Sequence, residues 1–558
     1  MDFAEQIQAL LKKTLQLEGT LEIPPDTKLG DYAFPCFNLA KTYKKSPHQI
    51  AQELSKQLHA DFLEKVEANG PYINFFVKKS DLMTQVVTTI LNQETTYGSA
   101  KKKKKILIEY PSPNTNKPLH LGHIRNILLG STISNLYQYQ GNTIIHANLN
   151  NDRGIHICKS MLAYQKWGKG KQPDKKTDHF VGDYYVRFAQ EAANHPELEQ
   201  EAQTMLQAWE AGDKDIRKLW KQMNTWAEEG FATTYKKFNL TFDKTYYESD
   251  IYDKGKTLVL EYLKKGVFTK DEKGAVIIDL TNEGLDKKVL LRSDGTTVYM
   301  TQDLYLAQLK EQEYHPDTSI YVVAHEQNYH FKVLFTLLNK LKIAKPETCY
   351  HLAYGMVYLP EGKMKSREGN VVDADDLIET MTNIAREELI KRYPKITKKE
   401  LERRAEAIGM AALRFHILKY DPLSDITFNP QETISFEGET GPYLQYTIAR
   451  INSIFTKYGT LPKKADLNLL TTPEDHLLAS MLYQFSSILE EATNHYKIHY
   501  LTQYLIRLAQ AFSNYYEHHQ ILKAEPALRD ARLHLCKTVH NVLSIGLTLL
   551  GITILEEM

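Results

Sequence analysis

The amino-acid sequence predicts three parts: an α+β domain, a doubly wound α/β domain that carries a helical insertion, and an all-α bundle. Strand-like and helix-like segments alternate in the middle of the chain, which is the pattern of a parallel sheet. Helical segments enclose short strand-like pieces near the amino end, and the last third is helical throughout. We place these parts at residues 1–103, 104–380 and 381–558, with the insertion at about 166–285.

The composition is that of a globular protein with several domains. The chain has 558 residues, of which 42% are hydrophobic and 25% are charged, enough for domains with cores of their own. It contains 69 basic and 69 acidic residues, so any surface for nucleic acid must be a local patch. The four cysteines form no CxxC pair, so they predict neither a zinc ribbon nor a disulfide framework: Cys36, Cys158, Cys349 and Cys536.

The first residues predict an amphipathic helix, because Ile7, Leu11 and Leu15 recur at helical spacing. They lack the order of a signal peptide, and no apolar run reaches the roughly 20 residues that span a bilayer. We therefore expect a cytoplasmic protein that does not insert into membranes. Lys101–Lys105 is a run of like charges that predicts a solvated connector at a domain boundary, with a nucleic-acid contact as the alternative.

The most informative segment is His120-Leu121-Gly122-His123. It follows an apolar run at Ile106–Tyr110, which predicts a buried strand, and a loop at Pro111–Pro118 that is rich in proline and asparagine. We predict a helix at Leu119–Leu136 whose first turn can accept Pro118 without losing a hydrogen bond.

The two histidines of this segment predict an anion site at the start of that helix. Side chains three residues apart share one helical face, and the backbone N–H groups and helix dipole already favour an anion there. Gly122 leaves room for a nucleotide ring beside the backbone. A chain with 20 histidines contains an HxxH pair by chance, but the glycine and the preceding strand and loop favour a phosphate site without a glycine-rich P-loop.

A second strand follows at Asn142–Leu149, so that strand, helix and strand form the first half of a doubly wound sheet. Polar residues cluster where this strand ends, at the edge of the sheet that binds ligands in such folds. A turn is the alternative interpretation. The residues of the cluster are Asn148, Asn150, Asn151 and Asp152.

Further segments complete the predicted fold. Val289–Leu291 and Ser319–Ala324 are strand-like. Helical periodicity then continues through Thr380–Lys391, the basic segment from Lys398 to Arg404, and the leucine-rich stretch at 475–556.

The segment His325–His330 is similar to the zinc motif HExxH, but its histidines are five residues apart. That spacing separates them by about 140° around a helix, so they do not stack as ligands of one ion. We predict no metal site there.

A second segment, Gly362–Asn370, carries three cations among five residues. Alone it predicts a solvated turn. Together with the histidine segment it resembles the KMSKS signature that accompanies HIGH in class I aminoacyl-tRNA synthetases, which hold ATP between the halves of a Rossmann-type fold. We name His120–His123 the first signature segment and Gly362–Asn370 the second signature segment.

The residues around both segments resemble arginyl-tRNA synthetases in particular, and the resemblance covers essentially the whole chain. It is carried by Glu109–Asn114, Ser293–Gly295, Tyr299–Asp303, Gly30–Ala33, Gly70–Phe75 and Tyr443–Arg450.

The resemblance implies an enzyme that works in two steps. Arginine reacts with ATP, which carries Mg²⁺, to form arginyl-adenylate and pyrophosphate, and the arginyl group then moves to tRNA(Arg). The resemblance also implies a Rossmann-type catalytic domain, an N-terminal add-on domain that contacts tRNA, and an all-α anticodon-binding bundle. We expect a monomer without bound zinc.

The resemblance also implies the roles of individual residues. Catalytic roles fall to His120, His123, Lys363 and Lys365. The two histidines contact ATP together with Gly122, Met364, Ser366 and Arg367. Arginine is bound by Glu109, Ser112, Asn114, Tyr299, Asp303 and Gln327, of which Asn114 and Gln327 hold the α-amino end.

The second signature segment departs from the family pattern. Aligned on Gly369-Asn370, the expected fourth residue, a lysine, is Ser366, while Lys365 stands one place early and Arg367 one place late. Lys117, just before the first signature segment, is placed to replace the missing charge. Arginyl enzymes that lack the second lysine resemble this chain in having a lysine there, so we predict Lys117 as a further catalytic residue.

The residues expected to bind arginine suit a guanidinium group. This group is planar and always charged, so its pocket needs carboxylates in its plane and an aromatic face, which Glu109, Asp303 and Tyr299 can supply. Lysine and citrulline lack the charged fork and would leave carboxylates unpaired, a discrimination of roughly 10⁴ to 10⁵. An editing domain is then unnecessary, and the modest insertion agrees with that.

The helical bundle must hold tRNA at its far end. Tyr443, Tyr446 and Arg450 can offer stacking planes and a phosphate contact, with core packing as the alternative. Other classes fit less well. A nucleotidylyltransferase has no use for the helical last third, a catalytically silent tRNA-binding protein needs no intact histidine signature, and a cysteine-specific synthetase should have zinc-binding cysteines.

Overall fold

The computed structural model describes residues 3–22, 24, 29–358, 360 and 372–558. Five residues of the second signature segment with predicted roles lie outside the described residues: Lys363, Met364, Lys365, Ser366 and Arg367. The chain folds into two compact units, which are described in turn. The first is made of Met1–Tyr97, Ile451–Ser486 and Arg507–Leu543, and the second of Gly98–Arg450, Ser487–Ile506 and Ser544–Met558.

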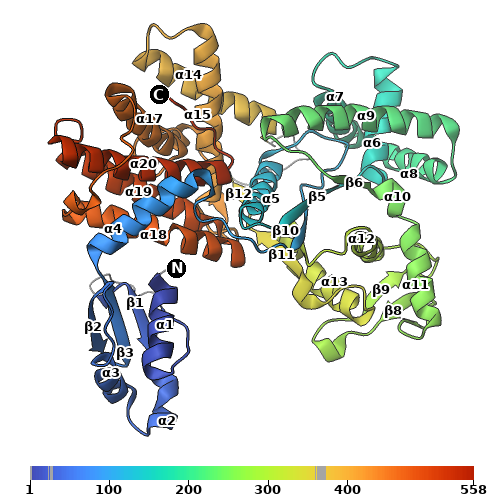
Figure 1. The fold of residues 1–558 in the computed structure, drawn as a ribbon. Helices are drawn as coiled ribbons and strands as arrows, with labels where there is room; N and C mark the ends of the chain where they lie inside the picture. The colour runs from blue at the N-terminus through green and yellow to red at the C-terminus, as the bar shows by residue number, and fades with distance from the viewer. Residues whose placement is uncertain (1–2, 23, 25–28, 359, 361–371) are drawn as a thin grey trace. The chain divides into compact units, whose positions relative to one another are not determined.

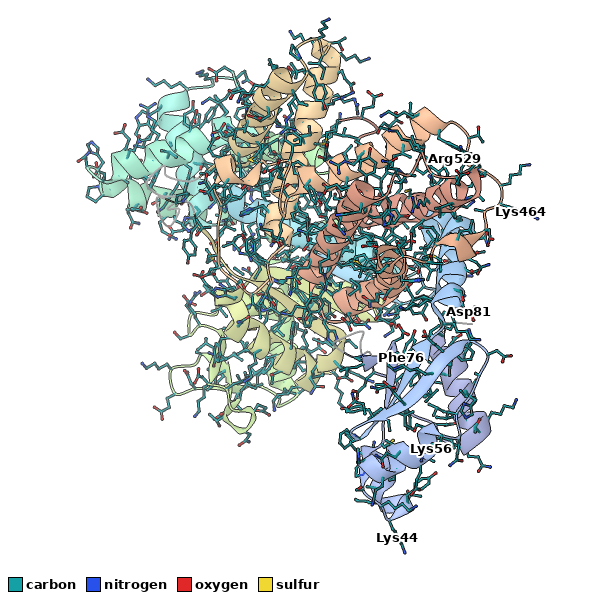
Figure 2. The ribbon with its side chains drawn as sticks, turned by 90° about the vertical axis from the view of Figure 1, so that its left-hand side faces the viewer. Lys44, Lys56, Phe76, Asp81, Lys464 and Arg529 are labelled. Carbon is teal, nitrogen blue, oxygen red and sulfur yellow. The ribbon has the colours of Figure 1, made fainter. Side chains whose placement is uncertain are left out.

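The amino-terminal part of the first unit is an antiparallel sheet in the order β1-β3-β2 with helices beside it (Figure 1). The predicted amphipathic helix is α1, which buries Phe3, Ile7 and Leu11. Phe76 lies on β3 of this sheet (Figure 2). The ammonium of Lys65 lies 3.9 Å from the ring centre of Phe76. The elements are α1 (Phe3–Leu15), β1 (Tyr32–Pro35), α2 (Ala40–Tyr43), α3 (Pro47–Ser55), β2 (Leu63–Asn69), β3 (Tyr72–Val77) and α4 (Lys79–Gln93).

A parallel sheet forms the centre of the second unit, in the order β11-β10-β4-β5-β6. The sequence predicts strands before and after the helix of the first signature segment and at residues 319–324. These strands are β4, β5 and β10. Ile106, Leu107 and Ile108 are all buried, because helices cover both faces of such a sheet. The strands are β4 (Lys105–Glu109), β5 (Thr143–Asn150), β6 (Lys244–Tyr247), β10 (Thr318–Ala324) and β11 (Cys349–Tyr354).

Alternate side chains at the end of β4 face different helices. Tyr110 packs on α5 (Leu121–Tyr139), where a Cβ at Gly130 would lie only 2.5 Å from the Tyr110 ring. Leu107 instead shares a core with Leu306 of α12 (Tyr299–Tyr314). Since side chains alternate along a strand, Glu109 faces the α12 side as Leu107 does.

The order of the strands reverses at β4, which pairs with β5 on one side and with β10 on the other. In sheets of this kind, ligands bind outside the carboxyl ends of the strands at this switch point. β4 ends at Glu109, and a single turn, His325–Gln327, follows β10. Two predicted arginine-binding residues, Glu109 and Gln327, therefore lie at the switch point.

The helix of the first signature segment begins later than the sequence predicted. α5 begins at Leu121 instead of Leu119, and His120 is its N-cap residue. Pro118 therefore lies before the helix and not in its first turn. The prediction was wrong because histidine is not among the residues that ordinarily mark the start of a helix.

The predicted helical insertion forms a core of its own (Figure 1). Its helical part ends at Lys237, and β6 then returns to the central sheet beside β5. The prediction of one insertion up to about residue 285 was wrong in this respect, because a four-residue edge strand is too short to show a periodicity. The helices are α6 (Ile155–Ala163), α7 (Thr177–Ala192), α8 (Glu197–Glu210) and α9 (Lys214–Lys237).

A small antiparallel sheet follows β6, in the order β7-β8-β9. The predicted strand at Val289–Leu291 belongs to this sheet and not to the central one. Its buried side chains share a core with α11, α12 and α13. The elements are α10 (Glu248–Ile251), α11 (Lys254–Lys264), β7 (Thr269–Lys270), β8 (Val276–Ile278), β9 (Lys288–Leu291) and α13 (Asn328–Lys340).

The remaining chain is helical apart from a short pair of strands, as predicted. Each of α17 to α20 contributes residues to both units. Within the ranges given above, no helix is long and apolar enough to cross a membrane. The elements are β12 (Val357–Tyr358), α14 (Ala374–Arg392), α15 (Lys398–Leu418), β13 (Ile426–Thr427), α16 (Pro430–Thr433), α17 (Gly441–Tyr458), α18 (Pro473–Asn494), α19 (Ile498–His518) and α20 (Pro526–Leu549).

Candidate active site

The first signature segment folds back on itself at the start of α5. The backbone N–H of Gly122 donates to Nδ1 of His120 over 3.1 Å, and the backbone N–H of His120 donates to Nδ1 of His123 over 3.1 Å. The two ring centres are 3.9 Å apart. Because each Nδ1 accepts a hydrogen bond, each ring carries its hydrogen on Nε2 and can donate it to a ligand.

Both imidazoles are held in the neutral form. Burial, together with the charge of Lys117, lowers the pKa of His120 to about 4. Burial, with contributions from His120 and Lys117, lowers the pKa of His123 well below its ordinary value. At neutral pH both side chains therefore offer N–H donors without a charge of their own.

Gly122 makes room for the first histidine. A Cβ at Gly122 would lie 3.0 Å from Cε1 of His120, a distance that is tight for such a contact. A larger residue would therefore push the imidazole out of this place. The predicted role of Gly122 in admitting a nucleotide ring stays a prediction.

Lys117 lies beside the first histidine. Lys117 and His120 line a pocket of ≈ 160 Å³ together with His179 of α7 and Asp373. Burial lowers the pKa of Lys117. In the part of the chain that the structure describes, its ammonium has no hydrogen bond or ion pair. The side chain is thus a cation that a ligand can use.

The polar residues at the end of β5 hold neighbouring segments in place. The backbone N–H of Ser112 donates to Oδ1 of Asn148 over 3.1 Å, and its carbonyl accepts from Nδ2 of Asn151 over 3.1 Å. Asn150 donates to α9, and Asp152 accepts from α10. The structure thus gives these residues a supporting role, and their predicted place beside a ligand stays a prediction.

The carboxylate of Glu109 forms an ion pair with the ammonium of Lys310 on α12. Lys310 is 1% exposed and Glu109 is 8% exposed, so both charges are buried. The ammonium also lies 4.7 Å from the ring centre of Tyr321. The charge of Glu109 is therefore balanced within the chain, by a residue that the sequence analysis missed because it lies 201 positions away.

Asp303 has a partner within the chain as well. It stands seven residues before Lys310 on α12, and its Oδ2 lies 2.5 Å from Nε2 of His330. The other histidine of the segment that is similar to HExxH, His325, lies 3.5 Å from Asp425 instead. These two histidines therefore contact different carboxylates. Each predicted guanidinium-binding carboxylate thus belongs to a pair with one member on α12. This member is Lys310 in the pair with Glu109 and Asp303 itself in the pair with His330.

Of the other predicted arginine-binding residues, Ser112 is half-buried and three are open to solvent. Tyr299 is 75% exposed at the start of α12, and Asn114 and Gln327 are exposed as well. Asn114 lies on the loop after β4, where it pairs with Asn151 as an isolated bridge. Asn114 and Gln327 follow β4 and β10, which are neighbours in the sheet, and Tyr299 begins α12.

A further acid, Glu248 of α10, lies near this group. Burial, opposed by Arg153 and reinforced by Asp152 and Asp303, raises the pKa of Glu248 to about 7. A strongly shifted carboxyl beside a predicted binding residue is typical of a functional site. The local sequence carries no sign of it, because the charges around Glu248 come from distant segments.

Val372–Asp375, directly after the second signature segment in the sequence, lies against the start of α5. The backbone N–H of Leu121 donates to the carbonyl of Val372 over 3.1 Å, and that of Ala374 donates to Leu119 over 2.9 Å. Asp373 is the N-cap residue of α14 and pairs with His120 as an isolated antiparallel bridge. The start of α5 and the start of α14 are therefore connected through main-chain hydrogen bonds.

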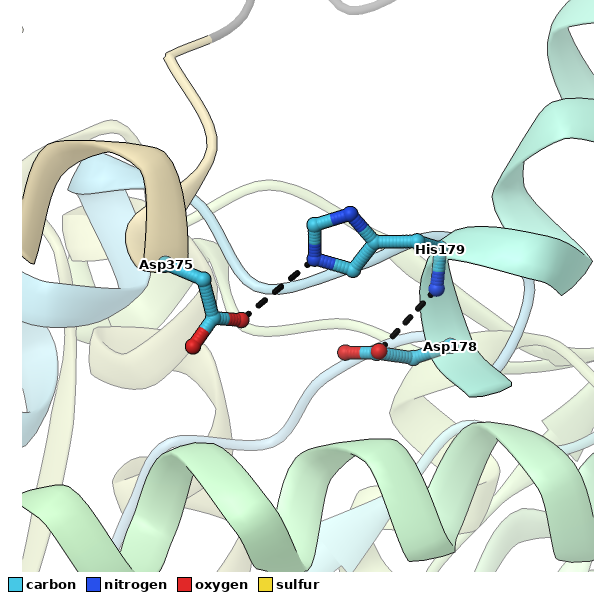
Figure 3. Close-up of side chains that lie close together, drawn as sticks. All are labelled: Asp178, His179 and Asp375. Atoms are coloured by element: carbon cyan, nitrogen blue, oxygen red, sulfur yellow. Dashed lines mark hydrogen bonds and ion pairs between the residues drawn. The ribbon is translucent and has the colours of Figure 1, made fainter. Parts of the chain in front are cut away.

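Asp178, His179 and Asp375 gather beside this connection, with ligand atoms within 4.8 Å of one another (Figure 3). These are residue types that bind metal ions. However, the ammonium groups of Lys176 and Lys237 lie 2.6 Å and 3.0 Å from the two oxygens of Asp375. Because cations of the chain already occupy this carboxylate, the arrangement is an ion-pair cluster and does not fit a metal site.

The residues predicted to contact tRNA are half-buried on α17. Nη2 of Arg450 donates to the hydroxyl of Tyr446 over 3.1 Å, and the guanidinium lies 4.8 Å from the ring centre of Tyr446. Tyr443 lies one turn earlier and is half-buried too. Partial burial fits both core packing and contact with nucleic acid, so the role in tRNA binding stays a prediction.

The parallel sheet, the donor pair at a helix start and the helical last third define a class I aminoacyl-tRNA synthetase. Three matches with known families support this class and narrow it. Residues 86–430 match "tRNA synthetases class I (R), catalytic domain", residues 444–558 match the DALR anticodon binding domain, and residues 1–77 match the arginyl tRNA synthetase N terminal domain. The chain belongs to the arginine–tRNA ligase family.

Individual relatives agree along the whole chain. The arginine–tRNA ligase of Treponema denticola is 44% identical, with 98% of this chain and 96% of that protein covered. That of Parabacteroides distasonis is 43% identical, with 95% and 94% covered. The solved structure of Thermus thermophilus arginyl-tRNA synthetase matches with a TM-score of 0.86 at 29% identity and covers 100% of this chain and 99% of that one. The predicted family and fold class are confirmed.

Proposed function

We propose that this enzyme activates L-arginine with ATP and transfers the arginyl group to the 3′-terminal adenosine of tRNA(Arg), with AMP and pyrophosphate as the other products. The observation that carries the proposal is the meeting of two kinds of group at one edge of the sheet. Neutral N–H donors at the start of α5 suit a triphosphate. Carboxylates at the end of β4 and on α12 suit a guanidinium.

The first step depends on alignment more than on acid–base chemistry. The carboxylate of arginine attacks the α-phosphorus and pyrophosphate leaves, so neither a covalent intermediate nor a general base is required. Fixed donors that stabilise charge on the phosphate oxygens lower the barrier. In this proposal His120 and His123 are those donors, and Lys117, Lys363 and Lys365 stabilise the leaving pyrophosphate. Further contacts with ATP are assigned to Gly122, Met364, Ser366 and Arg367.

Magnesium enters with ATP as part of the substrate. Mg²⁺ bound to phosphates keeps several waters, so it needs no cage of protein carboxylates. The acidic cluster of Asp178 and Asp375 is not a candidate, because lysine ammonium groups already pair with both carboxylates. We therefore assign no resident metal to the protein.

The arginine side chain is proposed to bind between Glu109 and Asp303, with Tyr299 along its plane. Each carboxylate has a side-chain partner in the free enzyme, Lys310 for Glu109 and His330 for Asp303. Lys310 is buried and stays in place, so the substrate uses the second oxygen of Glu109 and competes with His330 for Asp303. A lysine substrate brings a single ammonium and no planar fork, so it cannot reach both carboxylates in this way. The α-amino end is assigned to Asn114 and Gln327, and Ser112 lines the same loop.

The second step requires that tRNA reach both ends of the protein. The helices from α17 to α20 are proposed to bind the anticodon region, with Tyr443, Tyr446 and Arg450 as stacking and phosphate contacts. The amino-terminal sheet domain is proposed to contact tRNA elsewhere. We propose further that the enzyme acts as a monomer in the cytoplasm, where protein synthesis uses its product.

ATP–pyrophosphate exchange with each amino acid, with and without tRNA, tests the proposal. We expect exchange with arginine only, and only when tRNA is present, together with stable charging of tRNA(Arg) by labelled arginine. Exchange with a different amino acid would contradict the assigned specificity. Exchange with arginine but no charging would contradict the transfer step.

A further inference from the structure

A cluster of six charged side chains lies between the insertion and the start of α14. Its cations are Lys176, His179 and Lys237, from the beginning of α7 and the end of α9, and its anions are Asp178, Asp373 and Asp375. None of these residues belongs to either signature segment or to the arginine-binding residues. The charges balance, three against three.

The contacts of the cluster converge on the N-cap and the first turn of α14. Nε2 of His179 lies 3.3 Å from Asp373. It also lies 3.4 Å from Asp375 (Figure 3). Lys176 reaches Asp375 over 2.6 Å and Lys237 reaches it over 3.0 Å. Hydrogen bonds to both aspartates raise the pKa of His179 to about 10, so the imidazole is charged at neutral pH. Charged hydrogen bonds of this kind fix position more firmly than neutral ones.

The insertion is shaped for the cluster. Asp178 is completely buried, and its carboxylate accepts from Lys176 over 2.9 Å. A Cβ at Gly230 of α9 would lie 2.3 Å from Oδ1 of Asp178, so only glycine leaves room for that side chain. Lys176 also donates to Thr234, one turn further along α9, over 2.7 Å. Residues of α9 thus pack against Asp178 and accept a hydrogen bond from Lys176.

The cluster is connected to the donor pair by the main chain. Asp373, which His179 contacts, pairs with His120 as an antiparallel bridge. Ala374 and Leu121 complete this connection through backbone hydrogen bonds of 2.9 Å and 3.1 Å to Leu119 and Val372. His179, Asp373, His120 and Lys117 also line one pocket. A shift of the start of α14 would therefore move the groups that the proposed reaction uses.

We propose that His179, Lys176 and Lys237 are positioning residues for adenylate formation, which hold the start of α14 against the start of α5 and thereby fix His120 and Lys117 toward the triphosphate. This inference rests on the proposed function, because it assigns the residues to that reaction. They touch neither substrate, and they act through Asp373 and Asp375. An insertion that served only as a packing element would not need three cations aimed at this one helix start.

The test is ATP–pyrophosphate exchange with variants of the cluster. His179→Ala should lower kcat by about 10-fold or more and leave KM for arginine unchanged, because a misplacement of donors and cations affects the phosphate side alone. His179→Gln, which keeps a side-chain donor, should restore kcat to within about 3-fold of the wild type. Lys237→Met, whose side chain is 35% exposed, should lower kcat by about 3-fold.

Lys159→Met is the matched control. Lys159 is 18% exposed, close to the 20% of Lys176, and its ion pair with Glu199 joins two helices of the insertion without reaching α14. We expect kcat within about 2-fold of the wild type for this variant. Thermal unfolding followed by tryptophan fluorescence reports whether each variant is folded at the assay temperature. If His179→Ala is unfolded at the assay temperature, the kcat of Lys237→Met tests the inference instead.

Three results would overturn the inference. The first is a kcat of folded His179→Ala, or of Lys237→Met, that equals the wild-type value. The second is a loss that His179→Gln does not relieve. The third is an equal loss in Lys159→Met, which would indicate a general effect of weakening the insertion. Failure of the proposed function is distinguishable, because the wild type would then show no exchange with arginine.

Discussion

The phosphate side and the guanidinium side of the proposed active site treat charge in opposite ways. On the phosphate side, burial removes the charge of both imidazoles, and Lys117 is a cation without a partner among the described residues. On the guanidinium side, both carboxylates have partners from the same chain, the ammonium of Lys310 for Glu109 and the imidazole of His330 for Asp303.

The difference follows from the ligands. A triphosphate brings several negative charges, so the protein gains by presenting donors and a cation that are free to bind it. A guanidinium brings one positive charge, and a buried carboxylate without a partner would be costly before the substrate arrives. The comparison predicts that changes on the guanidinium side affect stability and arginine binding, whereas changes on the phosphate side affect the rate.

The largest expected effect is that of Lys310→Met. It leaves Glu109 buried and unpaired, which should lower the free energy of unfolding by about 3 to 5 kcal/mol. Denaturant unfolding followed by tryptophan fluorescence measures this, because all four tryptophans lie in the second unit, between residues 167 and 226. Combining the change with Glu109→Gln should recover most of the loss.

The exposed pair of Lys340 and Glu283 provides the control for that experiment. Both side chains are about one-third exposed, so Lys340→Met should cost at most about 1 kcal/mol. A loss below that value for Lys310→Met as well would show that the charge of Glu109 does not depend on its internal partner. The contrast between the two sides would then disappear.

Lys117→Ala should affect the rate and not the stability. The variant removes the available cation of the phosphate side, so adenylate formation should fall on the order of 10²-fold or more. Lys104→Ala, in the exposed connector before β4, is the control and should retain full exchange. Unchanged exchange in Lys117→Ala would mean that another group compensates for the lysine missing from the second signature segment.

Asp303→Asn should act on one substrate alone. Loss of a charged hydrogen bond to the guanidinium should raise KM for arginine by about 10- to 100-fold, while KM for ATP stays the same. Steady-state exchange at varied arginine and varied ATP separates the two. A rise in KM for ATP instead would contradict the division of the site into two sides.

The smallest expected effect is on the pH dependence of stability. His120 has a folded pKa of about 4, below its unfolded value, so its contribution is present above about pH 6.5 and is lost as the pH falls toward 4. The loss between pH 6.5 and 5 is at most about 2 kcal/mol. Denaturant unfolding at pH 5 and 7 should show this for the wild type and less for His120→Gln.

His179 provides the opposite sign in the same experiment. Its folded pKa of about 10 lies above the unfolded value, so its contribution is present below about pH 6.5 and is lost as the pH rises through 10. His179→Gln should therefore flatten the alkaline side of the stability profile and leave the acid side unchanged. Equal profiles for the two variants would contradict both assignments.

Much of the fold was predictable because its signals are local. The apolar run before Pro111, the breakers up to Pro118 and the helical pattern after them are the features that formed β4, the loop and α5. The two signature segments indicated the family for the same reason, because each consists of a few adjacent residues. The start of α5 was placed two residues too early because His120 caps the helix through a ring nitrogen, a role that residue preferences do not include.

The missed features all depend on distant partners. β6 is an edge strand only because β5 lies beside it. Nothing in the sequence around Lys310 indicates its role, because it balances Glu109 from 201 residues away. Burial among distant segments raises the pKa of Glu248, and hydrogen bonds to the carboxylates of Asp373 and Asp375 raise the pKa of His179. Periodicity along a chain cannot reveal electrostatic neighbours that are brought together by folding.

The order of strands and helices, the family and the candidate reactive residues were thus determined by the sequence itself, since backbone preferences and short motifs act over a few residues. The tertiary structure decided how those residues are charged and held. It set the neutral state of His120 by burial, the compensation of Glu109 by Lys310, and the connection of His179 to the start of α14. Charge and solvation depend on every neighbour in space, and only the folded chain defines those neighbours.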